Sequence, residues 1–324
     1  MHYYTYNRDP IGFIDKAAME QVFREGYENG LDILERGEGK VADYIPALAK
    51  ADPKDFAICG MLINGDIIAQ GDIDRRFSIQ SISKVINLAV ALRTYGVDEV
   101  FRHVMMEPSG DEFNSIIKLD TKNSLPFNPL INAGAIEVAS MLVEKYTFEE
   151  MLQFARELCM DPSIELDEEV YRSEFETGNR NRAIAYLLQS KGVLLADPQK
   201  TVDLYFKMCS LSVSAKSLAG LGLVLACDGM NPFSRESLIR PGYVRCIKSI
   251  MFTCGLYDYS GEFGVDVGIP AKSGVGGGIM CAARVPMGIG LWGPALDEHG
   301  NSIASVRALE HISHRLHLHV FDYR

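Results

Sequence analysis

The amino-acid sequence predicts an α+β fold, in which helices flank an antiparallel sheet and a helical subdomain is inserted between its strands. Two observations lead to this prediction. Strand-like runs occur near the two ends of the 324-residue chain. The long stretch between them has the apolar spacing of helices rather than the alternation of strands. Strands at both ends with helices between them favour one sheet that is assembled from both termini.

The N-terminal part is predicted to form a helix followed by a β-hairpin. We expect a helix from Ile14 to Arg36 because apolar residues recur there at helical spacing. Two strand-like runs follow, at 56–63 and 66–70. The dipeptide Asn64-Gly65 between them is the strongest short signal for a hairpin.

Helices account for most of the remaining chain. The segment 77–80 leads into a helix from Ser81 to Tyr95, and Gly96 ends that helix. The other predicted helices cover 135–146, 148–159, 182–191, 201–209, 214–227, 244–253 and 302–316. Further strands are predicted at 264–268, 278–284 and 288–292. We therefore expect a single unit over 1–324, with an α/β part at about 1–100 and 228–324 and an inserted helical part at about 101–227.

The composition excludes some classes of protein. A formal net charge of −11 argues against a nucleic-acid surface, which requires clustered Lys and Arg. Residues 1–10 lack the apolar core of a secretory signal, and the apolar stretch 218–227 is about half of a membrane span. The seven cysteines form no CxxC pair, so we expect buried free thiols and a cytoplasmic location.

Two polar clusters are not interpreted as sites. His311, His314, His317 and His319 lie near the C-terminus, but metal binding usually needs a converging carboxylate or cysteine as well. We expect a solvated helix and tail there, and we predict neither a metal nor another cofactor. The acidic run at 165–169 is predicted to be a loop or the first turn of a helix.

The first motif with chemical meaning is Ser81-Ile82-Ser83-Lys84. Residues three apart share a helix face, so the Ser81 hydroxyl and the Lys84 amine can meet. A serine becomes a good nucleophile when a neighbour takes its proton, and a lysine can do so if its pKa is lowered. Ser-x-x-Lys also occurs by chance in many helices, so this motif alone is weak. Its position where a strand-like run turns into a helix strengthens it.

The second motif is the segment Lys272-Ser273-Gly274, which continues to Gly278. It could be a surface glycine loop. A phosphate-binding Walker loop does not fit, because its lysine follows the glycines. The third interpretation pairs this strand with the upstream Ser-x-x-Lys, as in penicillin-recognising serine enzymes. The glycines would then let a substrate carbonyl approach a backbone N–H. We favour this interpretation because the two motifs together are far more specific than either one.

One element of those penicillin-recognising enzymes is missing. They carry Ser-Asp-Asn or Tyr-x-Asn between the two motifs, and no Ser-Asp-Asn occurs in this chain. The only Tyr-x-Asn is Tyr27-Glu28-Asn29, which precedes the predicted nucleophile. A true β-lactamase is therefore disfavoured, and another group must handle the second proton.

From about Gly39 to Asn301 the sequence resembles the serine-dependent glutaminase family, which is related to the β-lactamases. The resemblance is carried by 39–46 (GKVADYIP), 80–84 (QSISK), 107–110 (EPSG), 128–135 (NPLINAGA), 173–174 (SE), 176–181 (ETGNRN), 254–258 (CGLYD), 260–261 (SG) and 270–275 (PAKSGV). It implies a fold like that of the serine β-lactamases and penicillin-binding proteins. It also implies a homo-oligomer, a dimer or tetramer. No ankyrin-like extension follows the matched part.

The resemblance also implies an activity, the hydrolysis of L-glutamine to glutamate and ammonia through an acyl-enzyme. Ser81 would be the nucleophile, Lys84 its base and Tyr257 a proton relay. The backbones of Ser81 and Val275 would hold the oxyanion. The implied substrate contacts are Tyr44, Ser81, Asn132, Glu174, Asn181, Tyr205, Tyr257 and Val275.

These residue types suit free glutamine, although each has a structural alternative. A carboxylate such as Glu174 matches the ammonium of the substrate, and amides and phenols match its carboxylate. Without the resemblance, Glu174 could belong to a helix-capping region, Asn181 to a helix surface, and Tyr44 and Tyr205 to the core. Two other functions stay open: an amidase for another small amino-acid amide, or a glutamine sensor without turnover. Retention of all three predicted catalytic residues argues against the sensor.

Overall fold

A computed structural model describes residues 15–109 and 125–322. Its main sheet has five antiparallel strands in the order β2-β1-β8-β7-β6. The strands are β1 (Ala57–Leu62), β2 (Ile67–Gly71), β6 (Ala271–Ser273), β7 (Gly278–Ala283) and β8 (Met287–Trp292). Two strands come from the N-terminal part and three from the C-terminal part. The predicted sheet built from both ends of the chain is therefore confirmed.

The β1–β2 hairpin forms where Asn64-Gly65 predicted it. Leu62 and Asp66 close the loop through a hydrogen bond of 2.9 Å from the Leu62 N–H to the Asp66 carbonyl. The loop thus holds three residues, and Gly65 adopts a φ of 91°. This arrangement is a type I turn followed by a left-handed glycine, a common three-residue hairpin.

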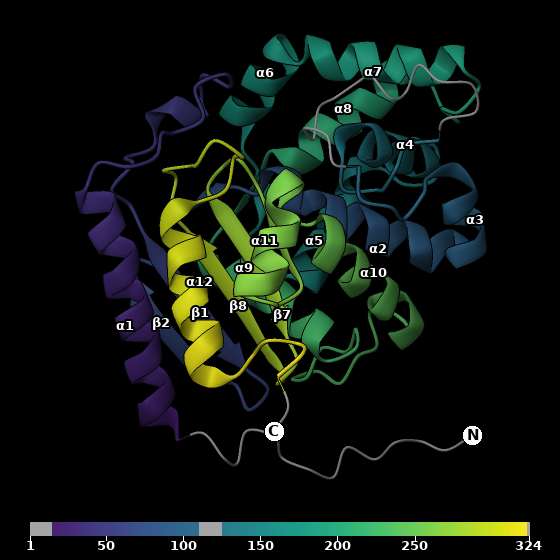
Figure 1. Cartoon of the computed structure of the whole chain (residues 1–324). Helices are drawn as coiled ribbons and strands as arrows, with labels where there is room; N and C mark the ends of the chain where they lie inside the picture. Colours follow the sequence, from purple (N-terminus) through teal and green to yellow (C-terminus); the bar gives the residue numbers. More distant parts are fainter. Residues whose placement is uncertain (1–14, 110–124, 323–324) are drawn as a thin grey trace, which may run out of the picture.

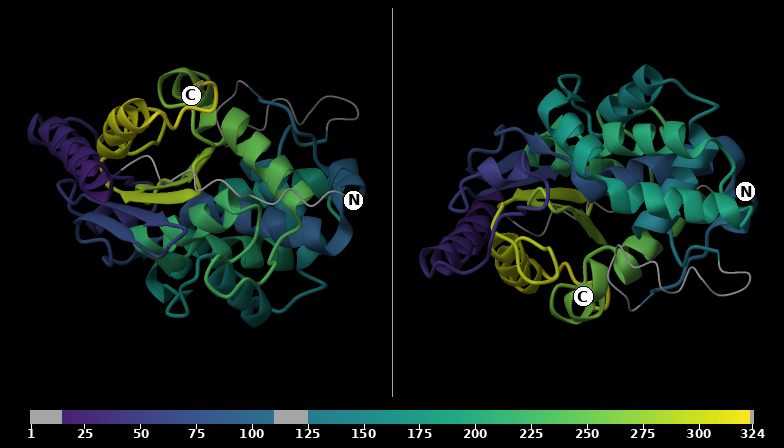
Figure 2. Two further views of the ribbon diagram at one scale, coloured as in Figure 1. Left: turned by 90° about the horizontal axis from the view of Figure 1, so that it is seen from below. Right: turned by 90° about the horizontal axis from the view of Figure 1, so that it is seen from above.

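Helices cover both faces of this sheet (Figures 1 and 2). On one face α1 (Lys16–Glu35) packs side by side with α12 (Ile303–Leu316). Their buried residues join an apolar core with β1, β7 and β8, which includes Phe23, Ile58 and Ile312. On the other face α9 (Ala215–Ala226) packs against β8, β7 and β1. The two strands predicted at 278–284 and 288–292 are thus central and buried on both faces.

Glycines in the central strands bring α9 unusually close to the sheet. A Cβ atom at Gly288 would lie 1.9 Å from the Ala219 carbonyl oxygen. One at Gly290 would lie 1.9 Å from the Ala215 carbonyl oxygen. Side chains at these positions cannot fit without moving the helix, so the strand backbone itself forms the contact surface.

Most of the remaining described chain is helical and packs beside the sheet. Its helices are α2 (Ser83–Tyr95), α3 (Val97–His103), α4 (Asn132–Leu142), α5 (Phe148–Leu158), α6 (Glu168–Thr177), α7 (Asn179–Ser190), α8 (Pro198–Cys209), α10 (Pro241–Cys254) and α11 (Ser260–Asp266). A second, three-stranded sheet has the order β3 (Phe77–Ser78), β5 (Leu211–Val213) and β4 (Glu165–Leu166). No helix of the described residues is long and apolar enough to cross a membrane.

The fold differs from the sequence-based prediction in one element. The strand predicted at 264–268 is wrong, because residues 260–266 form α11. Gly264, Val265 and Asp266 form the last turn of this short helix, and Val267 and Gly268 follow its end. The predicted division at residues 100 and 227 stays a prediction. The segment 101–227 includes α9, which packs on the main sheet.

Candidate active site

Ser81 lies in a single turn of 3₁₀-helix, η2 (Gln80–Ile82), which runs directly into α2. The preceding strand β3 and this turn are buried along their whole length. Gln80 has a φ of 49°, a left-handed conformation that is uncommon for a residue with a side chain. Uncommon backbone conformations of this kind are found more often at functional sites than elsewhere.

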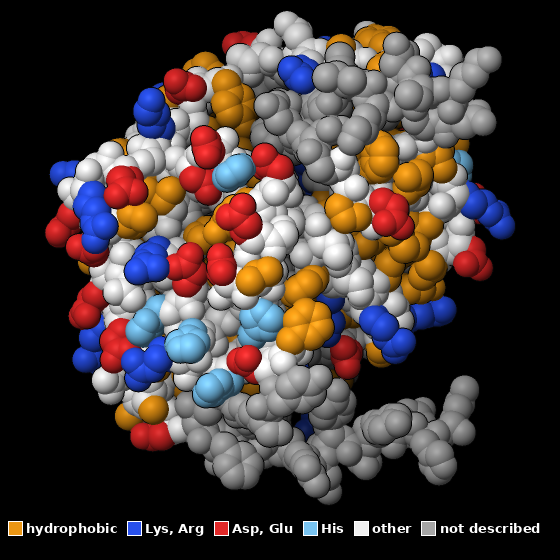
Figure 3. Space-filling view, in the orientation of Figure 1, with side chains coloured by type: hydrophobic (Ala, Val, Ile, Leu, Met, Phe, Trp, Pro, Cys, Tyr) orange, Lys and Arg blue, Asp and Glu red, His pale blue; other side chains and the backbone are white. Residues whose placement is uncertain are grey.

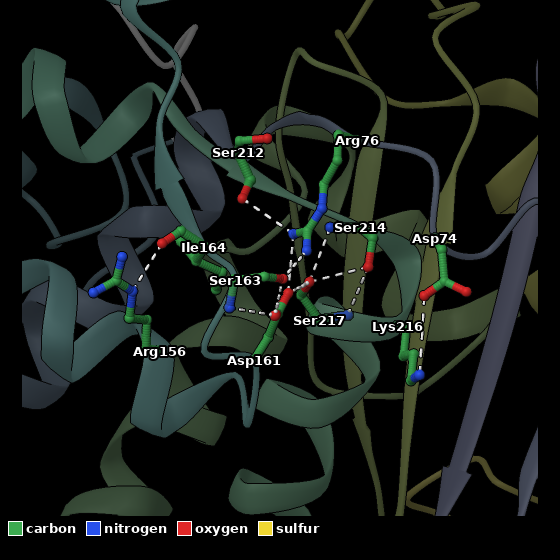
Figure 4. A network of polar contacts seen from close by, with 10 residues as sticks. All are labelled: Asp74, Arg76, Arg156, Asp161, Ser163, Ile164, Ser212, Ser214, Lys216 and Ser217. Atoms are coloured by element: carbon green, nitrogen blue, oxygen red, sulfur yellow. Dashed lines mark hydrogen bonds and ion pairs between the residues drawn. The ribbon is translucent and has the colours of Figure 1, made fainter.

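A polar network fixes the strand that leads to this turn (Figure 4). The Arg76 guanidinium pairs with Asp161 at 2.9 Å and donates to the Ser212 carbonyl at 3.3 Å. Asp161 also accepts a hydrogen bond of 2.6 Å from Ser217, on the first turn of α9. Burial acts to raise the pKa of Asp161, but hydrogen bonds from Ser163, Ser217 and Arg76 together outweigh it and lower that pKa to about 2. The network therefore joins β3, β5 and α9 just upstream of Ser81.

Lys84 lies on the first turn of α2 and is 1% exposed. Its amine donates hydrogen bonds to the Leu130 carbonyl at 3.1 Å and to Asn132 Oδ1 at 2.6 Å. Burial lowers the pKa of Lys84 to about 8, against the opposing influence of Cys209 and Glu174. A lysine in this state holds an accessible lone pair near neutral pH, which an exposed lysine does not.

A cavity of about 130 Å³ opens over Ser81. Among the residues that line it are seven of the predicted substrate contacts: Tyr44, Ser81, Asn132, Glu174, Asn181, Tyr205 and Val275. They come from segments far apart in the chain, including η2, α4, α6, α7 and α8. Tyr44 is 55% exposed and lies at the rim, whereas Tyr205 is buried.

The amide of Asn132 organises one wall of this cavity. Its oxygen accepts from Lys84 and, over 3.3 Å, from the Tyr205 hydroxyl. Its nitrogen donates to Asn181 Oδ1 at 3.0 Å. These contacts fix which way the amide points, because a rotation by 180° would place a donor opposite the Lys84 donor.

Glu174 provides the buried carboxyl group of the cavity. It lies near the C-terminal end of α6, so the alternative role in an N-terminal capping region does not apply. Burial raises the pKa of Glu174 to about 7, while a hydrogen bond with Gln80 and the charge of Lys84 act in the opposite direction. Because burial disfavours the ionised form of such a carboxylate, a cation bound beside it stabilises that form strongly.

Tyr257 approaches Ser81 from the opposite side, at the start of a second 3₁₀ turn, η4 (Tyr257–Tyr259). Its hydroxyl makes hydrogen bonds with Ser81 and, at 3.4 Å, with the Ser273 carbonyl. Burial raises the pKa of Tyr257 to about 12, although hydrogen bonds with the side chains of Ser81 and Ser273 act in the opposite direction. The phenol is therefore neutral at physiological pH and can pass on a proton.

The segment 272–275 runs alongside Ser81. A Cβ atom at Gly274 would lie 3.3 Å from the Ser81 backbone nitrogen, so the two backbones are nearly in contact. Within the described part of the chain, the backbone N–H groups of Ser81 and Val275 have no hydrogen-bond acceptor. Backbone donors without an acceptor, next to a serine hydroxyl, are groups that can stabilise a negative charge on a bound oxygen.

Comparison with known proteins identifies the family. A family model described as Glutaminase matches residues 39–321. The chain is 48% identical over 298 residues to Glutaminase 2 of Clostridium perfringens, which covers 91% of this chain and 97% of that protein. It is 45% identical to a glutaminase of Clostridium botulinum, over 94% of this chain and 100% of the relative. The chain belongs to the glutaminase family.

Solved structures agree with this assignment. A probable glutaminase, ybaS, superposes with a TM-score of 0.90 at 35% identity, over 96% of this chain and 100% of that one. The Bacillus subtilis glutaminase YbgJ, in a covalent complex with 5-oxo-L-norleucine, superposes with a TM-score of 0.80 at 35% identity. That comparison covers 94% of this chain and 99% of YbgJ. The serine β-lactamase-like fold predicted from the sequence is thereby confirmed.

Several residues of this glutaminase-family site were not predicted. Gln80, Arg180 and Cys209 also line the cavity. The buried Lys272 amine donates to the Gly255 carbonyl at 2.9 Å and the Ser273 carbonyl at 2.6 Å, and it lies 4.3 Å from the centre of the Tyr257 ring. Lys272 belongs to a motif that the sequence singled out, but its partners depend on the packing of β6 against the C-terminal end of α10, which spacing in the sequence does not reveal.

The C-terminal histidines of this family member lie outside the cavity. His311 contacts Glu25 at 2.8 Å and His319 contacts the Gly264 carbonyl at 3.1 Å. Figure 3 shows histidine side chains on the face formed by α12, interspersed with acidic and basic residues. All seven cysteines are free, and five of them are buried.

Proposed function

We propose that this chain hydrolyses L-glutamine to L-glutamate and ammonia through an acyl-enzyme on Ser81. The observation that carries the proposal is the position of Ser81. Ser81 lines a cavity together with residues that suit free glutamine. Its side chain also shares a hydrogen bond with the neutral phenol of Tyr257. A buried lysine with a lowered pKa lies three residues away, on the same run of helix.

The first step is attack of the Ser81 oxygen on the side-chain amide carbon of glutamine. Lys84 takes the hydroxyl proton as the carbon–oxygen bond forms. In its neutral form, Lys84 can use its two N–H groups on Leu130 and Asn132 and keep its lone pair for that proton. The two hydrogen bonds thus hold the amine in one orientation, which a general base requires.

The backbone N–H groups of Ser81 and Val275 stabilise the negative charge that develops on the amide oxygen by donating hydrogen bonds to it. Breakdown of the tetrahedral intermediate breaks the carbon–nitrogen bond, and the leaving group needs a proton to depart as ammonia. Tyr257 donates or relays that proton, since its hydroxyl contacts Ser81 and is not ionised. Water then attacks the ester carbon and gives up a proton to the same groups. The bond between that carbon and the Ser81 oxygen breaks, the proton passes to this oxygen to restore the hydroxyl, and glutamate leaves.

The cavity would distinguish free glutamine from other amides by its charged ends. Glu174 pairs with the α-ammonium of glutamine. Its α-carboxylate is surrounded by the amides of Asn132 and Asn181 and by the hydroxyls of Tyr44 and Tyr205. A site that pairs polar groups discriminates strongly against ligands that lack them, since its own groups then stay buried without partners. The small volume, about 130 Å³, also suits a single amino acid.

We further propose that the protein works in the cytoplasm as a homo-oligomer. The seven free cysteines support a reducing compartment, because thiols of secreted proteins are commonly paired. The oligomer is implied by the resemblance to the family, and light scattering of the purified protein measures it directly.

Steady-state turnover tests the proposed activity. Wild type and Ser81→Ala are compared by ammonia release from glutamine and asparagine, and by the absorbance change that follows ring opening of the β-lactam nitrocefin. Ser83→Ala serves as the matched control, because Ser83 is a neighbouring buried hydroxyl that donates to the Gln80 carbonyl at 2.7 Å. We expect turnover of glutamine by wild type and Ser83→Ala, and loss of about 10⁴-fold or more in Ser81→Ala.

The alternatives give distinct outcomes in the same experiment. Faster ammonia release from asparagine would favour an amidase for another substrate. Glutamine binding without release by wild type would favour a sensor. Equal rates in wild type and Ser81→Ala would reject the mechanism.

A further inference from the structure

Tyr257 is held in a backbone conformation that requires outside support. Its φ is 58°, in the left-handed region, which is disfavoured for a residue with a side chain. Local contacts supply part of that support. Ser260 Oγ donates to the Tyr257 carbonyl at 2.8 Å and accepts from the Leu256 N–H at 3.0 Å. The rest comes from a loop distant in sequence.

That loop, residues 297–301, is closed by its own hydrogen bonds. Asp297 Oδ1 accepts from the backbone N–H groups of His299 at 2.9 Å and Asn301 at 2.8 Å. The Asp297 N–H donates to the Asn301 carbonyl at 2.9 Å, and Gly300 has a φ of 90°. A carboxylate that binds two N–H groups of one short loop makes that loop a rigid unit.

The side chain of His299 links this loop to η4. Its Nδ1 atom lies 3.1 Å from Asp258 Oδ2, and its ring stacks on Tyr259 with 5.6 Å between the ring centres. The same loop borders the active site. A Cβ atom at Gly300 would lie 3.5 Å from Val275 Cγ1 and 3.7 Å from Tyr257 Cε2. His299 therefore contacts both residues that follow Tyr257 in η4, while its own loop packs on the Tyr257 ring.

We infer that His299 is a positioning residue for the reaction, which through Asp258 and Tyr259 holds the Tyr257 phenol against Ser81. The inference rests on the role proposed for Tyr257 in the hydrolysis. In this role His299 does not contact the substrate. Its effect would be on turnover rather than on binding of glutamine.

The charge of His299 adds a dependence on pH. Burial lowers the pKa of the His299 imidazole, but the hydrogen bond and charge of Asp258 outweigh it, so the pKa stands above the usual value. Asp297 and Glu298, on its own loop, act in the same direction. The facing element η4 contributes Asp258 and Tyr259, and Glu310 of α12 acts on Tyr259. The ionic pair with Asp258 is complete at low pH and weakens as pH rises through the His299 pKa.

A double-mutant cycle tests this inference. His299→Gln keeps a hydrogen-bond donor without the charge, and it is made in wild type and in Tyr257→Phe. We expect kcat for glutamine to fall about five-fold with KM unchanged in wild type, the scale of a partly exposed ion pair. In Tyr257→Phe the same change should have no further effect. Asp258→Asn serves as a second variant should His299→Gln fold poorly, with the same expectation.

The controls separate positioning from general stability. His311→Gln breaks a comparable histidine–carboxylate pair, with Glu25 at 2.8 Å, far from the site, and should leave kcat unchanged. The ratio of wild-type to His299→Gln kcat should be largest at low pH and approach one at high pH, since the ionisation of Lys84 cancels in the ratio.

An equal loss in both backgrounds, or no loss in wild type, would overturn the inference. Absence of ammonia release by wild type would instead overturn the proposed function.

Discussion

Lys84 and Asn132 are joined by a hydrogen bond of 2.6 Å between the lysine amine and the amide oxygen. Asn132 in turn donates to Asn181, and both amides line the cavity. The predicted base and the predicted substrate pocket are therefore parts of one hydrogen-bond network. A substrate that displaces or tightens this network would change the environment of Lys84 at the same time as it binds.

The pH dependence of kcat/KM should show two ionisations on its acid side. Both Glu174, with a pKa of about 7, and Lys84, with a pKa of about 8, must lose a proton before they can act. The logarithm of kcat/KM should then rise with a slope of about 2 below pH 7, about 1 between the two values, and level off above pH 8. Ammonia release at low substrate concentration, between pH 5.5 and 9.5, measures this profile.

Asn132→Asp should move the upper ionisation to higher pH by at least one unit. The substitution places a carboxylate at the atom that now accepts from Lys84, and an opposite charge at that distance favours the ammonium form. A midpoint that stays in place would show that Lys84 does not govern the upper ionisation.

Glu174 should control binding of the α-ammonium group. In a Ser81→Ala background, where chemistry is removed, calorimetric Kd for glutamine should decrease as pH rises through about 7, because Glu174 gains its charge there. Glu174→Gln in this background should weaken binding on the order of 30-fold and abolish that pH dependence. Glu176→Gln is the matched control, since Glu176 is an exposed carboxylate of the same helix. Equal effects of the two substitutions would contradict the assignment.

Gly288→Ala should destabilise the fold by about 2–3 kcal/mol or more. The new Cβ atom would lie 1.9 Å from the Ala219 carbonyl oxygen and 2.2 Å from the Leu223 nitrogen, so α9 must move away from the sheet. Gly242→Ala is the control, because no atom lies within 4 Å of its Cβ position in α10. An alanine there should stabilise by up to about 1 kcal/mol. Urea unfolding of both variants measures the difference, and similar values would refute the packing argument.

Local sequence signals predicted much of the fold. Asn64-Gly65 fixed the first hairpin, and apolar spacing located α1, α9 and α12 to within a few residues. The strand predicted at 264–268 failed because a segment rich in glycine and valine is compatible with either structure until tertiary contacts decide. α4 begins at Asn132 rather than near 135, and so Asn132 projects from a first helical turn.

Local sequence could predict the site residues only where they lie close together in the chain. Ser81 and Lys84 are three residues apart, so helical geometry alone could join them. Asn132, Glu174 and Tyr257 are brought to Ser81 by packing between distant helices, and only the resemblance to a family indicated them. Nothing local marked the left-handed φ of Gln80 and Tyr257, or the pairing of His299 with Asp258. These features depend on tertiary contacts.

The most direct test of the central claim, that Ser81 is the nucleophile, is covalent labelling by 6-diazo-5-oxo-L-norleucine, the reagent that formed the covalent complex of YbgJ. The labelled protein is digested and the modified peptide is sequenced by mass spectrometry. We predict a single adduct on Ser81, formed in wild type and Ser83→Ala, absent in Ser81→Ala, and slowed by added glutamate. An adduct on any other residue, or undiminished labelling of Ser81→Ala, would contradict the mechanism.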